Sequence, residues 1–452
     1  MNKLITDFVT HLRQWSPAQI AWQGLRLGLI TLPFSPALGL GCFVFILGWG
    51  LRSYAHIYKK RPLTWIWGGI ILLLIASTTQ ASFPLEAALG LANFIPFILL
   101  FIVLRELLRT PHQLLCIQRI IALSVLPLVL LGCGQLWGIW HGPVQWGWLI
   151  QWSLVSGGTP QGRMDSVFGY ANVFASYLMI AFPFILSFFT QSWQANPKPW
   201  WSLWGDRCLW SVSLGMASLG LLLSHSRNAW MIGTLIWFSF ALYLRWYRWL
   251  LAGLGALGSI FWAAFGPVGR SLFQQIIPIY LWGRLNDQLY PNRPPSELRI
   301  TQWQFAWQLT LEHPWLGWGL RNFSPLYKAE MGQWLGHPHN FFLMMAAETG
   351  IPVILGFSAI VAGILAQGII HRPDNFSPSS APSPQALLRF STLISFLAST
   401  LFHCFDITLF DARINLLNWL LLAAISSIPD WTDQPSFGVS VPQTLDRLPP
   451  TP

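Results

Sequence analysis

Histidines and arginines stand in the polar segments that interrupt a very apolar chain. His337 and His339 flank a proline in His337-Pro338-His339-Asn340, directly before an apolar run. A histidine in this position can act as a general base toward a hydroxyl, because its unperturbed pKa is about 6.5. Two histidines at this spacing could instead bind a metal ion. The loop offers no accompanying carboxylate or cysteine cluster, so we predict no metal site and no cofactor. In the alternative interpretation, Asn340 caps a helix and both histidines are bystanders.

Arg299 is predicted to lie in the first turn of an amphipathic helix over 296–312. Apolar residues recur there at three- and four-residue spacing: Ile300, Trp303, Trp307 and Leu311. A cation at a helix N-terminus is unfavourable unless a negative group lies nearby. Helix N-termini bind phosphates, and a guanidinium adds a planar set of donors. Arg299 is therefore a candidate diphosphate ligand, with pairing to Glu297 or exposure to water as the alternative.

Arg227 and Arg163 stand at predicted membrane boundaries. Arg227 lies in the polar break Ser224-His225-Ser226-Arg227-Asn228 between two apolar runs, and Arg163 precedes the run that opens at Phe168. Charges at that depth are costly and are usually paired or functional. Each arginine alone could simply extend toward water, but together with Arg299 they predict an anion site outside the membrane.

The composition is that of an integral membrane protein. Of 452 residues, 54% are hydrophobic and only 9% are charged, against about 25% charged in soluble domains. The net charge of +10 is dispersed in short clusters between apolar runs, which indicates membrane topology and excludes a nucleic-acid groove. The five cysteines lie in or beside apolar segments, without the spacing of a zinc site or a disulfide framework.

The apolar runs predict an all-α polytopic fold of about twelve transmembrane helices. The predicted spans are 17–33, 36–51, 64–80, 88–104, 119–139, 167–189, 208–223, 229–245, 249–266, 341–368, 388–405 and 411–428. This divides the chain into N-terminal transmembrane helices (1–267), a long loop (268–340), C-terminal transmembrane helices (341–428) and a disordered tail (429–452). A second disordered linker is predicted over 372–385, from its proline- and serine-rich composition.

Basic residues cluster in alternate short loops. Arg52 to Arg61 fill one such loop, and Arg105 and Arg109 flank another. By the positive-inside rule these loops are cytoplasmic, together with both termini and the tail. The long loop 268–340 is then extracytoplasmic, on the face that carries the candidate arginines and histidines.

These motifs resemble the O-antigen ligase and polymerase superfamily of bacterial envelope glycosyltransferases. The resemblance covers about residues 160 to 365. The matching stretches are 163–172, Ser226-Arg227-Asn228-Ala229-Trp230, 299–303, 313–319, Asn322-Phe323, 337–340 and Glu348-Thr349-Gly350. One departure is Tyr170-Ala171-Asn172, where the family usually has Asn-Pro-Asn, so the helix end there is in doubt.

The resemblance implies an inner-membrane enzyme of lipopolysaccharide and cell-envelope polysaccharide biosynthesis. It would transfer a glycan, without metal, from an undecaprenyl diphosphate carrier to an acceptor hydroxyl on a lipid, glycan or protein. Arg227 and Arg299 would hold the diphosphate, with Arg163 near the same path. His339, with His337 as second choice, would be the base.

Two alternatives stay open. A polymerase would use another lipid-linked glycan as acceptor. A transporter is the other, because a cyanobacterial group named as inorganic-carbon transporters is similar over the same region. Transporters usually contain internal repeats, and we find no convincing repeat. Asp406 and Asp411 are assigned to structural pairing and left outside the core site. Glu348 could orient a partner near the site or form a hydrogen bond to a neighbouring helix.

Overall fold

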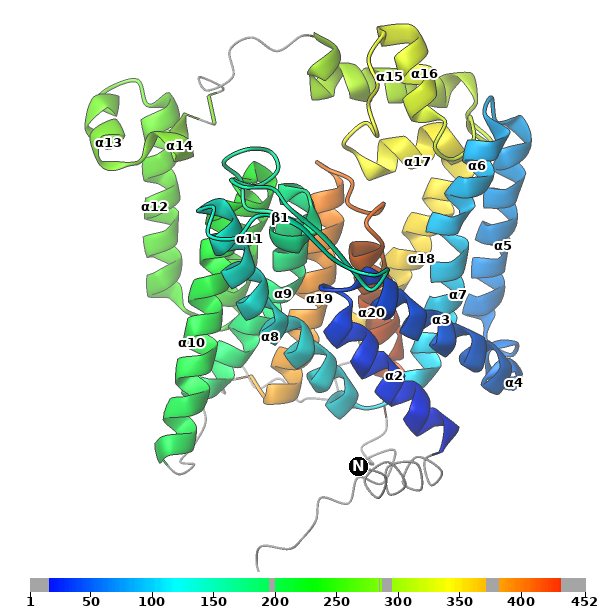
Figure 1. Ribbon diagram of the computed structural model, residues 1–452, viewed down its shortest axis with the longest axis horizontal. Helices are drawn as coiled ribbons and strands as arrows, with labels where there is room; N and C mark the ends of the chain where they lie inside the picture. Colours follow the sequence, from blue (N-terminus) through cyan, green and yellow to red (C-terminus); the bar gives the residue numbers. More distant parts are fainter. Residues whose placement is uncertain (1–15, 195–199, 284, 287–294, 371–381, 432–452) are drawn as a thin grey trace, which may run out of the picture.

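The computed structural model describes residues 16–194, 200–283, 285–286, 295–370 and 382–431. Long helices stand side by side in a bundle, and shorter helices cover one end of it (Figure 1). Of the described residues, 76% are helical, in agreement with the predicted helical class. Most of the predicted linker and nearly all of the predicted tail lie outside the described residues.

Many helices begin at a proline, whose fixed φ suits the first helical position. Ser16 and Thr110 add capping boxes, each with a glutamine three residues on. Helices with proline at their first or second residue include α2 (Pro17–Thr31), α3 (Pro36–Ser53), α5 (Pro62–Ser77), α6 (Pro84–Gly90), α7 (Ile95–Leu107), α8 (Pro111–Leu136) and α19 (Pro384–His403). Because α19 begins at Pro384, the predicted linker 372–385 ends earlier than expected.

Nine helical stretches among the described residues are long and apolar enough to cross a membrane. They include α3, α5, α6 with α7, α8 and α19, together with α9 (Ala171–Gln194), α12 (Tyr247–Phe265), α18 (Ile351–Ile370) and α20 (Ala412–Ser427). The bundle also contains α2, α10 (Trp200–Leu223) and α11 (Arg227–Tyr243). Of these, α2 has 15 residues and α11 has 17, at or below the lower limit of about 17 for a span.

The centre of the bundle is formed by α9 and α20. The most apolar stretch of α9 is 89% buried and that of α20 is 83% buried, against 11% for α12. The sides of α9 are covered by α8, α10, α11 and α19. Asn172, at the start of α9, is one of the polar side chains of the candidate site.

Two predictions about elements are wrong. The expected span 341–368 is two helices, α17 (Phe341–Thr349) and α18, separated by Gly350. Gly350 has φ +84°, and a Cβ there would lie 2.3 Å from the Trp315 carbonyl oxygen, so the chain can turn at this point only with glycine. The all-α prediction also missed a β-hairpin, β1 (Gly142–Trp146) paired with β2 (Ile150–Leu154).

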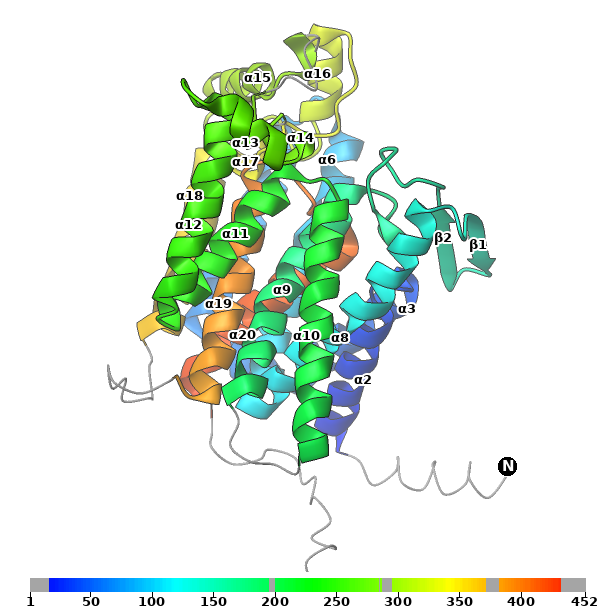
Figure 2. The same cartoon turned by 90° about the vertical axis from the view of Figure 1, so that its left-hand side faces the viewer.

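The hairpin projects from the side of the bundle near α3 and α8 (Figure 2). The Trp152 indole donates to the Phe34 carbonyl at 2.6 Å, and the Ser35 hydroxyl donates to the Leu149 carbonyl. Both bonds reach the turn between α2 and α3, so the hairpin is anchored at the end of that helical pair.

The long loop contains more structure than the single helix predicted for it. It forms α13 (Arg270–Ile276), α14 (Ile279–Trp282), α15 (Arg299–Glu312) and α16 (Phe323–Met331). A small core of Phe305, Ala306, Leu309, Phe323, Tyr327 and Ala347 joins α15, α16 and α17. The predicted apolar stripe is therefore not the packed face of α15. Ile300, Trp307 and Leu311 are exposed, because α17 covers the side that carries Phe305 and Leu309.

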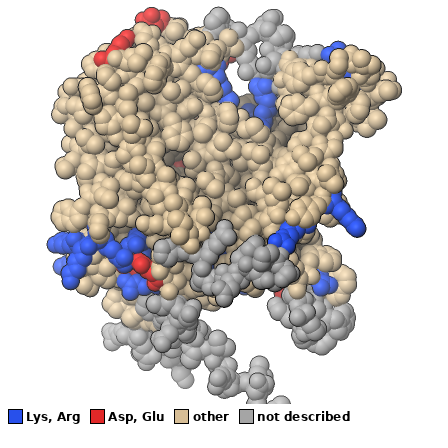
Figure 3. Space-filling view, turned by 180° about the vertical axis from the view of Figure 1, so that it is seen from behind, with Lys and Arg blue, Asp and Glu red and all other residues tan. Residues whose placement is uncertain are grey.

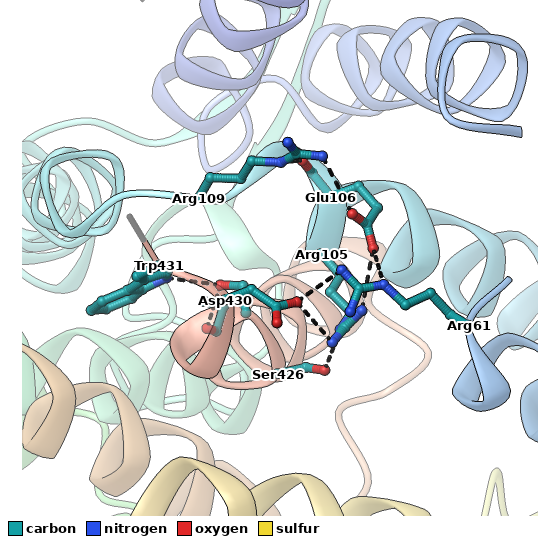
Figure 4. A network of polar contacts seen from close by, with 9 residues as sticks. Arg61, Arg105, Glu106, Arg109, Ser426, Asp430 and Trp431 are labelled. Carbon is teal, nitrogen blue, oxygen red and sulfur yellow. Dashed lines mark hydrogen bonds and ion pairs between the residues drawn. The ribbon is translucent and has the colours of Figure 1, made fainter. Parts of the chain in front are cut away.

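At the opposite end of the bundle, three arginines form ion pairs with one buried carboxylate (Figure 4). Glu106 is 3% exposed and pairs with Arg61 and Arg105 at 3.2 Å and with Arg109 at 3.4 Å. Asp430, which is 41% exposed, adds ion pairs to Arg61 and Arg105. The network joins the start of α5 to the ends of α7 and α20. The arginines predicted to mark the cytoplasmic side thus have a structural role as well.

We expect Glu106→Gln to destabilise the bundle far more than Asp430→Asn does. The first change leaves three guanidinium groups around a buried neutral amide, and breaking such a pair costs about 3–5 kcal/mol. The second removes a partly exposed partner, which is worth about 1 kcal/mol or less. Thermal unfolding of the purified protein in detergent measures both. Equal losses in the two variants would contradict a central role for Glu106.

Candidate functional site

Three elements hold the segment from His337 to Asn340 in place. The Asn340 side chain accepts from the Leu343 backbone N–H at 3.0 Å and so caps α17. Its amide nitrogen donates to the Cys404 carbonyl at the end of α19. From α15, the Trp303 indole donates to the Pro338 carbonyl at 3.0 Å. The capping role expected for Asn340 is therefore real, and it fixes the two histidines beside the end of α19.

His339 contacts a carboxylate that is far away in sequence. Its Nδ1 lies 2.9 Å from Asp406 Oδ1. An ionised carboxylate only accepts hydrogen bonds, so Nδ1 carries the proton and Nε2 presents its lone pair. Nε2 has no hydrogen bond to any described residue, and the side chain is 25% exposed. The backbone of His339 is left-handed, with φ +54°, a conformation that is uncommon outside glycine and often found at functional sites.

Asp406 is buried and receives hydrogen bonds on both carboxylate oxygens. Oδ1 accepts from His339 and from the Ile407 backbone N–H, and Oδ2 accepts from the Asn172 amide at the start of α9. Burial alone would raise the pKa of this carboxyl, but His339, His337 and Asn172 together lower it below its usual range. Asp406 is therefore a fixed negative charge at neutral pH.

His337 is a weaker base than an ordinary histidine. Burial lowers the pKa of its imidazole to about 4, and the charges of His339, His403 and Arg299 act in the same direction, against Asp406. Its Nδ1 already accepts from the His339 backbone N–H at 3.2 Å. At neutral pH His337 is thus neutral, with one ring nitrogen occupied in shaping the loop.

Arg163 is joined to Asp406 through Asn172. Its guanidinium donates to the Asn172 side-chain oxygen and, at 2.9 Å, to the Ser224 carbonyl. Ser224 belongs to the same turn as Arg227, which is the first residue of α11 and is exposed. The chain of contacts therefore runs from Asp406 to the polar break that carries Arg227.

Arg299 is the first residue of α15, and its side chain is exposed. Its charge acts on both His337 and Tyr170. Burial raises the pKa of the Tyr170 phenol, Asp406 raises it further, and Arg163 and Arg299 oppose both. Tyr170 consequently lies within electrostatic reach of Asp406 and two candidate arginines.

Figure 3 shows basic side chains on both sides of an opening at this end of the molecule.

Several charged groups on the same face have structural partners instead. Arg321 pairs with Glu86 at 3.1 Å. Arg413 pairs with Asp411, donates to the Val167 carbonyl and lies 4.0 Å from the centre of the Phe168 ring. Glu348 accepts from the Phe323 backbone N–H at the start of α16. The contact of Asp411 agrees with its assignment to structural pairing, and that of Glu348 agrees with the alternative of a hydrogen bond to a neighbouring helix.

For Asp406 that assignment was incomplete, since this carboxylate also contacts His339. The argument used against a metal site fails for the same reason. The loop itself has no suitable carboxylate, but Asp406 brings one from the α19–α20 connection. One ligand atom each from His337, His339 and Asp406 lies within 4.8 Å of the others. Two imidazoles and a carboxylate are a donor set that zinc accepts, so the absence of a metal has to be tested by experiment.

Asp406 and Asn172 were missed as site residues because neither stands in a motif with the histidines. Both are at helix ends on the face that was predicted to carry the site. A polar residue at the end of an apolar span, on the same side as a candidate base, is the signal that could have identified them.

Comparison with known proteins agrees with the predicted resemblance. Residues 212–358 match the family model described as O-Antigen ligase. The matched segment runs from α10 to α18 and contains Arg227, Arg299, His337 and His339. The resemblance to the O-antigen ligase superfamily is thus confirmed over residues 212–358. No curated protein matches the chain.

We expect Asp406→Asn to release the fixed tautomer of His339. An amide has one acceptor oxygen, so it cannot accept from both His339 and Asn172 as the carboxylate does. In ¹⁵N NMR spectra of histidine-labelled protein, the single Nδ1–H form should become a mixture, with a His339→Gln spectrum identifying the signals. Asp411→Asn, which leaves this contact intact, should keep the wild-type pattern. An unchanged tautomer in Asp406→Asn would show that Asp406 does not orient the ring.

Proposed function

We propose that this chain, whose residues 212–358 match the O-antigen ligase family, transfers a glycan from undecaprenyl diphosphate to an acceptor hydroxyl on the extracytoplasmic face. The observation that carries the proposal is the His339–Asp406 contact of 2.9 Å at the end of a membrane bundle. Asn172 links Asp406 to Arg163 by hydrogen bonds, and the charge of Arg299 acts on the neighbouring His337. A base and cations are what this transfer requires of the protein.

His339 is the base in this proposal. The acceptor oxygen attacks the anomeric carbon, its proton passes to His339 Nε2, and the bond from that carbon to the phosphate oxygen breaks. The electron pair of that bond leaves with the diphosphate. Asp406 stabilises the imidazolium that forms, as a buried carboxylate beside a histidine does. His337 is unsuited to this role, because its pKa is about 4.

The arginines bind the leaving group. Arg299 lies at the N-terminus of α15, where the helix dipole also favours an anion. Arg163 and Arg227 approach from the turns before α9 and α11. Guanidinium groups placed around a developing phosphate charge stabilise the transition state without proton transfer. The proposal therefore needs no metal ion.

We favour the ligase reaction, in which the acceptor is a lipid or another envelope component, over the polymerase reaction, in which it is a second lipid-linked glycan. The family match supports an enzyme over a transporter. Offering both kinds of acceptor to the same protein distinguishes ligase from polymerase by the length of the labelled product.

We expect His339→Ala and Arg299→Ala to impair transfer in different ways. Loss of the base should lower kcat by roughly 10²- to 10⁴-fold. Loss of one guanidinium contact should lower kcat/KM by about 10- to 100-fold. Purified protein in liposomes, given a labelled undecaprenyl diphosphate oligosaccharide and acceptors, measures both. The matched control is Lys328→Ala, which removes an exposed charge of α16. Full activity of His339→Ala would exclude His339 as the base.

Removal of metal provides a separate test. If the arginines supply the positive charge, EDTA or 1,10-phenanthroline should leave the rate of transfer unchanged. The alternative is a metal held by His337, His339 and Asp406, which predicts loss of activity with chelator and recovery with zinc. That outcome would replace the base assignment with metal chemistry.

A further inference from the structure

The β-hairpin has one apolar face and one polar face. Successive side chains of a strand point to opposite sides, and the antiparallel register of β1 and β2 fixes which residues share a side. One side carries Val144, Trp146, Ile150, Trp152 and Leu154. The other side carries Pro143, Gln145, Gln151 and Ser153. A sheet with this pattern covers apolar surface with its first face and meets a polar medium with its second.

Only half of the apolar face packs on the protein. On β2, Leu154 is 3% exposed, and the Trp152 indole donates to the Phe34 carbonyl. On β1, Trp146 is 71% exposed and Val144 is also exposed. In Figure 2, β2 lies between β1 and the bundle. The apolar side of β1 therefore extends past the edge of the protein, where no described residue covers it.

The bundle beside this overhang is apolar as well. The hairpin projects from the side near α3 and α8, and its turn is bonded to Ser35, directly before α3. Long and apolar enough to cross a membrane, α3 exposes Leu38, Val44 and Phe45 along its length. Exposed apolar side chains of a membrane-spanning helix contact lipid. The overhanging half of the hairpin thus continues a lipid-facing surface of the bundle.

The composition of the hairpin fits the boundary between lipid and water. No Asp, Glu, Lys or Arg stands between Arg119 and Arg163, although a surface that faces bulk water usually carries such residues. Tryptophan is concentrated at membrane–water interfaces, because its ring is apolar and its N–H is polar. Five tryptophans lie within 16 positions: Trp137, Trp140, Trp146, Trp148 and Trp152.

The backbone of the hairpin sets its depth. Among the described residues β1 pairs only with β2, so its outer edge has backbone groups without a strand partner. An open sheet edge is not tolerated in the hydrocarbon of a bilayer, where nothing else can form the missing hydrogen bonds. Water and lipid headgroups can form them, and they can also bind the amides of Gln145 and Gln151. The hairpin is therefore suited to the headgroup level and not to the hydrocarbon.

We propose that β1–β2 is an interfacial anchor that binds the lipid leaflet at the end of the bundle that carries the candidate site. Trp146 and Val144 contact the acyl chains next to their ester groups, and the polar face meets the headgroups. This inference goes beyond the proposed function and does not depend on it, because the ligand is the phospholipid surface itself.

The anchor is joined to the candidate site by a short segment with bonds at both ends. The Gly157 N–H donates to the Gln135 carbonyl at the end of α8, and the Ala171 N–H donates to the Thr159 carbonyl at the start of α9. Arg163 lies within this segment. A hairpin held at the headgroup level therefore also holds Arg163 near the level of lipid phosphate groups.

Photolabelling in proteoliposomes of phosphatidylcholine and phosphatidylglycerol tests the inference. Three diazirine probes report three environments. The first is a phosphatidylcholine with the diazirine next to the glycerol ester, the second carries it at the end of an acyl chain, and the third is a charged, water-soluble diazirine. Labelled peptides of the full-length protein are identified by mass spectrometry. No donor or acceptor is added, so the result is independent of glycan transfer.

We expect residues 140–152 to be labelled most strongly by the probe at the ester level. Labelling mainly by the water-soluble diazirine would place the hairpin in water, and labelling mainly by the chain-end probe would place it in the hydrocarbon. Protection from all three would show that protein, such as a second copy of the chain, covers it. Each of these three results would overturn the inference.

Two variants make the test specific to the tryptophans. Trp146→Gln combined with Trp148→Gln should raise water-soluble labelling of residues 140–152 about threefold or more, since the amphipathic rings no longer hold the hairpin at the interface. Trp334→Gln makes the same change at an exposed tryptophan between α16 and α17 and should leave that labelling unchanged. No increase in the double variant, or an equal increase in Trp334→Gln, would contradict the anchor. If the double variant does not fold, the labelling of the wild type decides.

Discussion

The arrangement of the site depends on one buried carboxylate. Asp406 is 2% exposed, and a charge at that depth is unfavourable unless donors surround it. The donors come from three separate parts of the chain: the histidine loop before α17, the start of α9 and the backbone after α19. Asn172 in turn accepts from Arg163. The need to compensate a single charge thus brings together a candidate base, an amide that links two groups and a candidate phosphate ligand.

At both ends of the bundle a buried carboxylate is compensated by donors, but the donors differ. Around Glu106, three guanidinium groups compensate one buried carboxylate and tie helix ends together. Around Asp406, the donors are the His339 imidazole, the Asn172 amide and the Ile407 backbone N–H, and the second ring nitrogen of His339 has no hydrogen bond to a described residue. Arginine cannot release its proton at neutral pH, whereas histidine can. The first cluster is suited to holding helices together and the second to moving a proton.

The apolar runs were sufficient to predict a polytopic helical bundle, because apolar length directly indicates a membrane span. They did not predict the break at Gly350, since that turn depends on the approach of the Trp315 carbonyl. The apolar stripe predicted on α15 is not its packed face, because this helix has apolar residues on two sides and α17 covers the other one. His339 and Arg299 were selected by their position beside helix ends. Asp406 was not, because its contact with His339 spans 67 positions and leaves no local pattern.

Because the backbone of His339 is left-handed, the imidazole can be removed by substitutions that keep the path of the loop. At φ +54°, a β-branched residue is strongly disfavoured, while asparagine and glycine adopt this conformation readily. His339→Asn and His339→Gly should accordingly preserve the path of residues 337–340 and remove the imidazole. Such variants are suited to trapping an unreacted complex of donor and acceptor for structure determination. Substitution of this one strained residue would thereby allow both substrates to be observed together in the site.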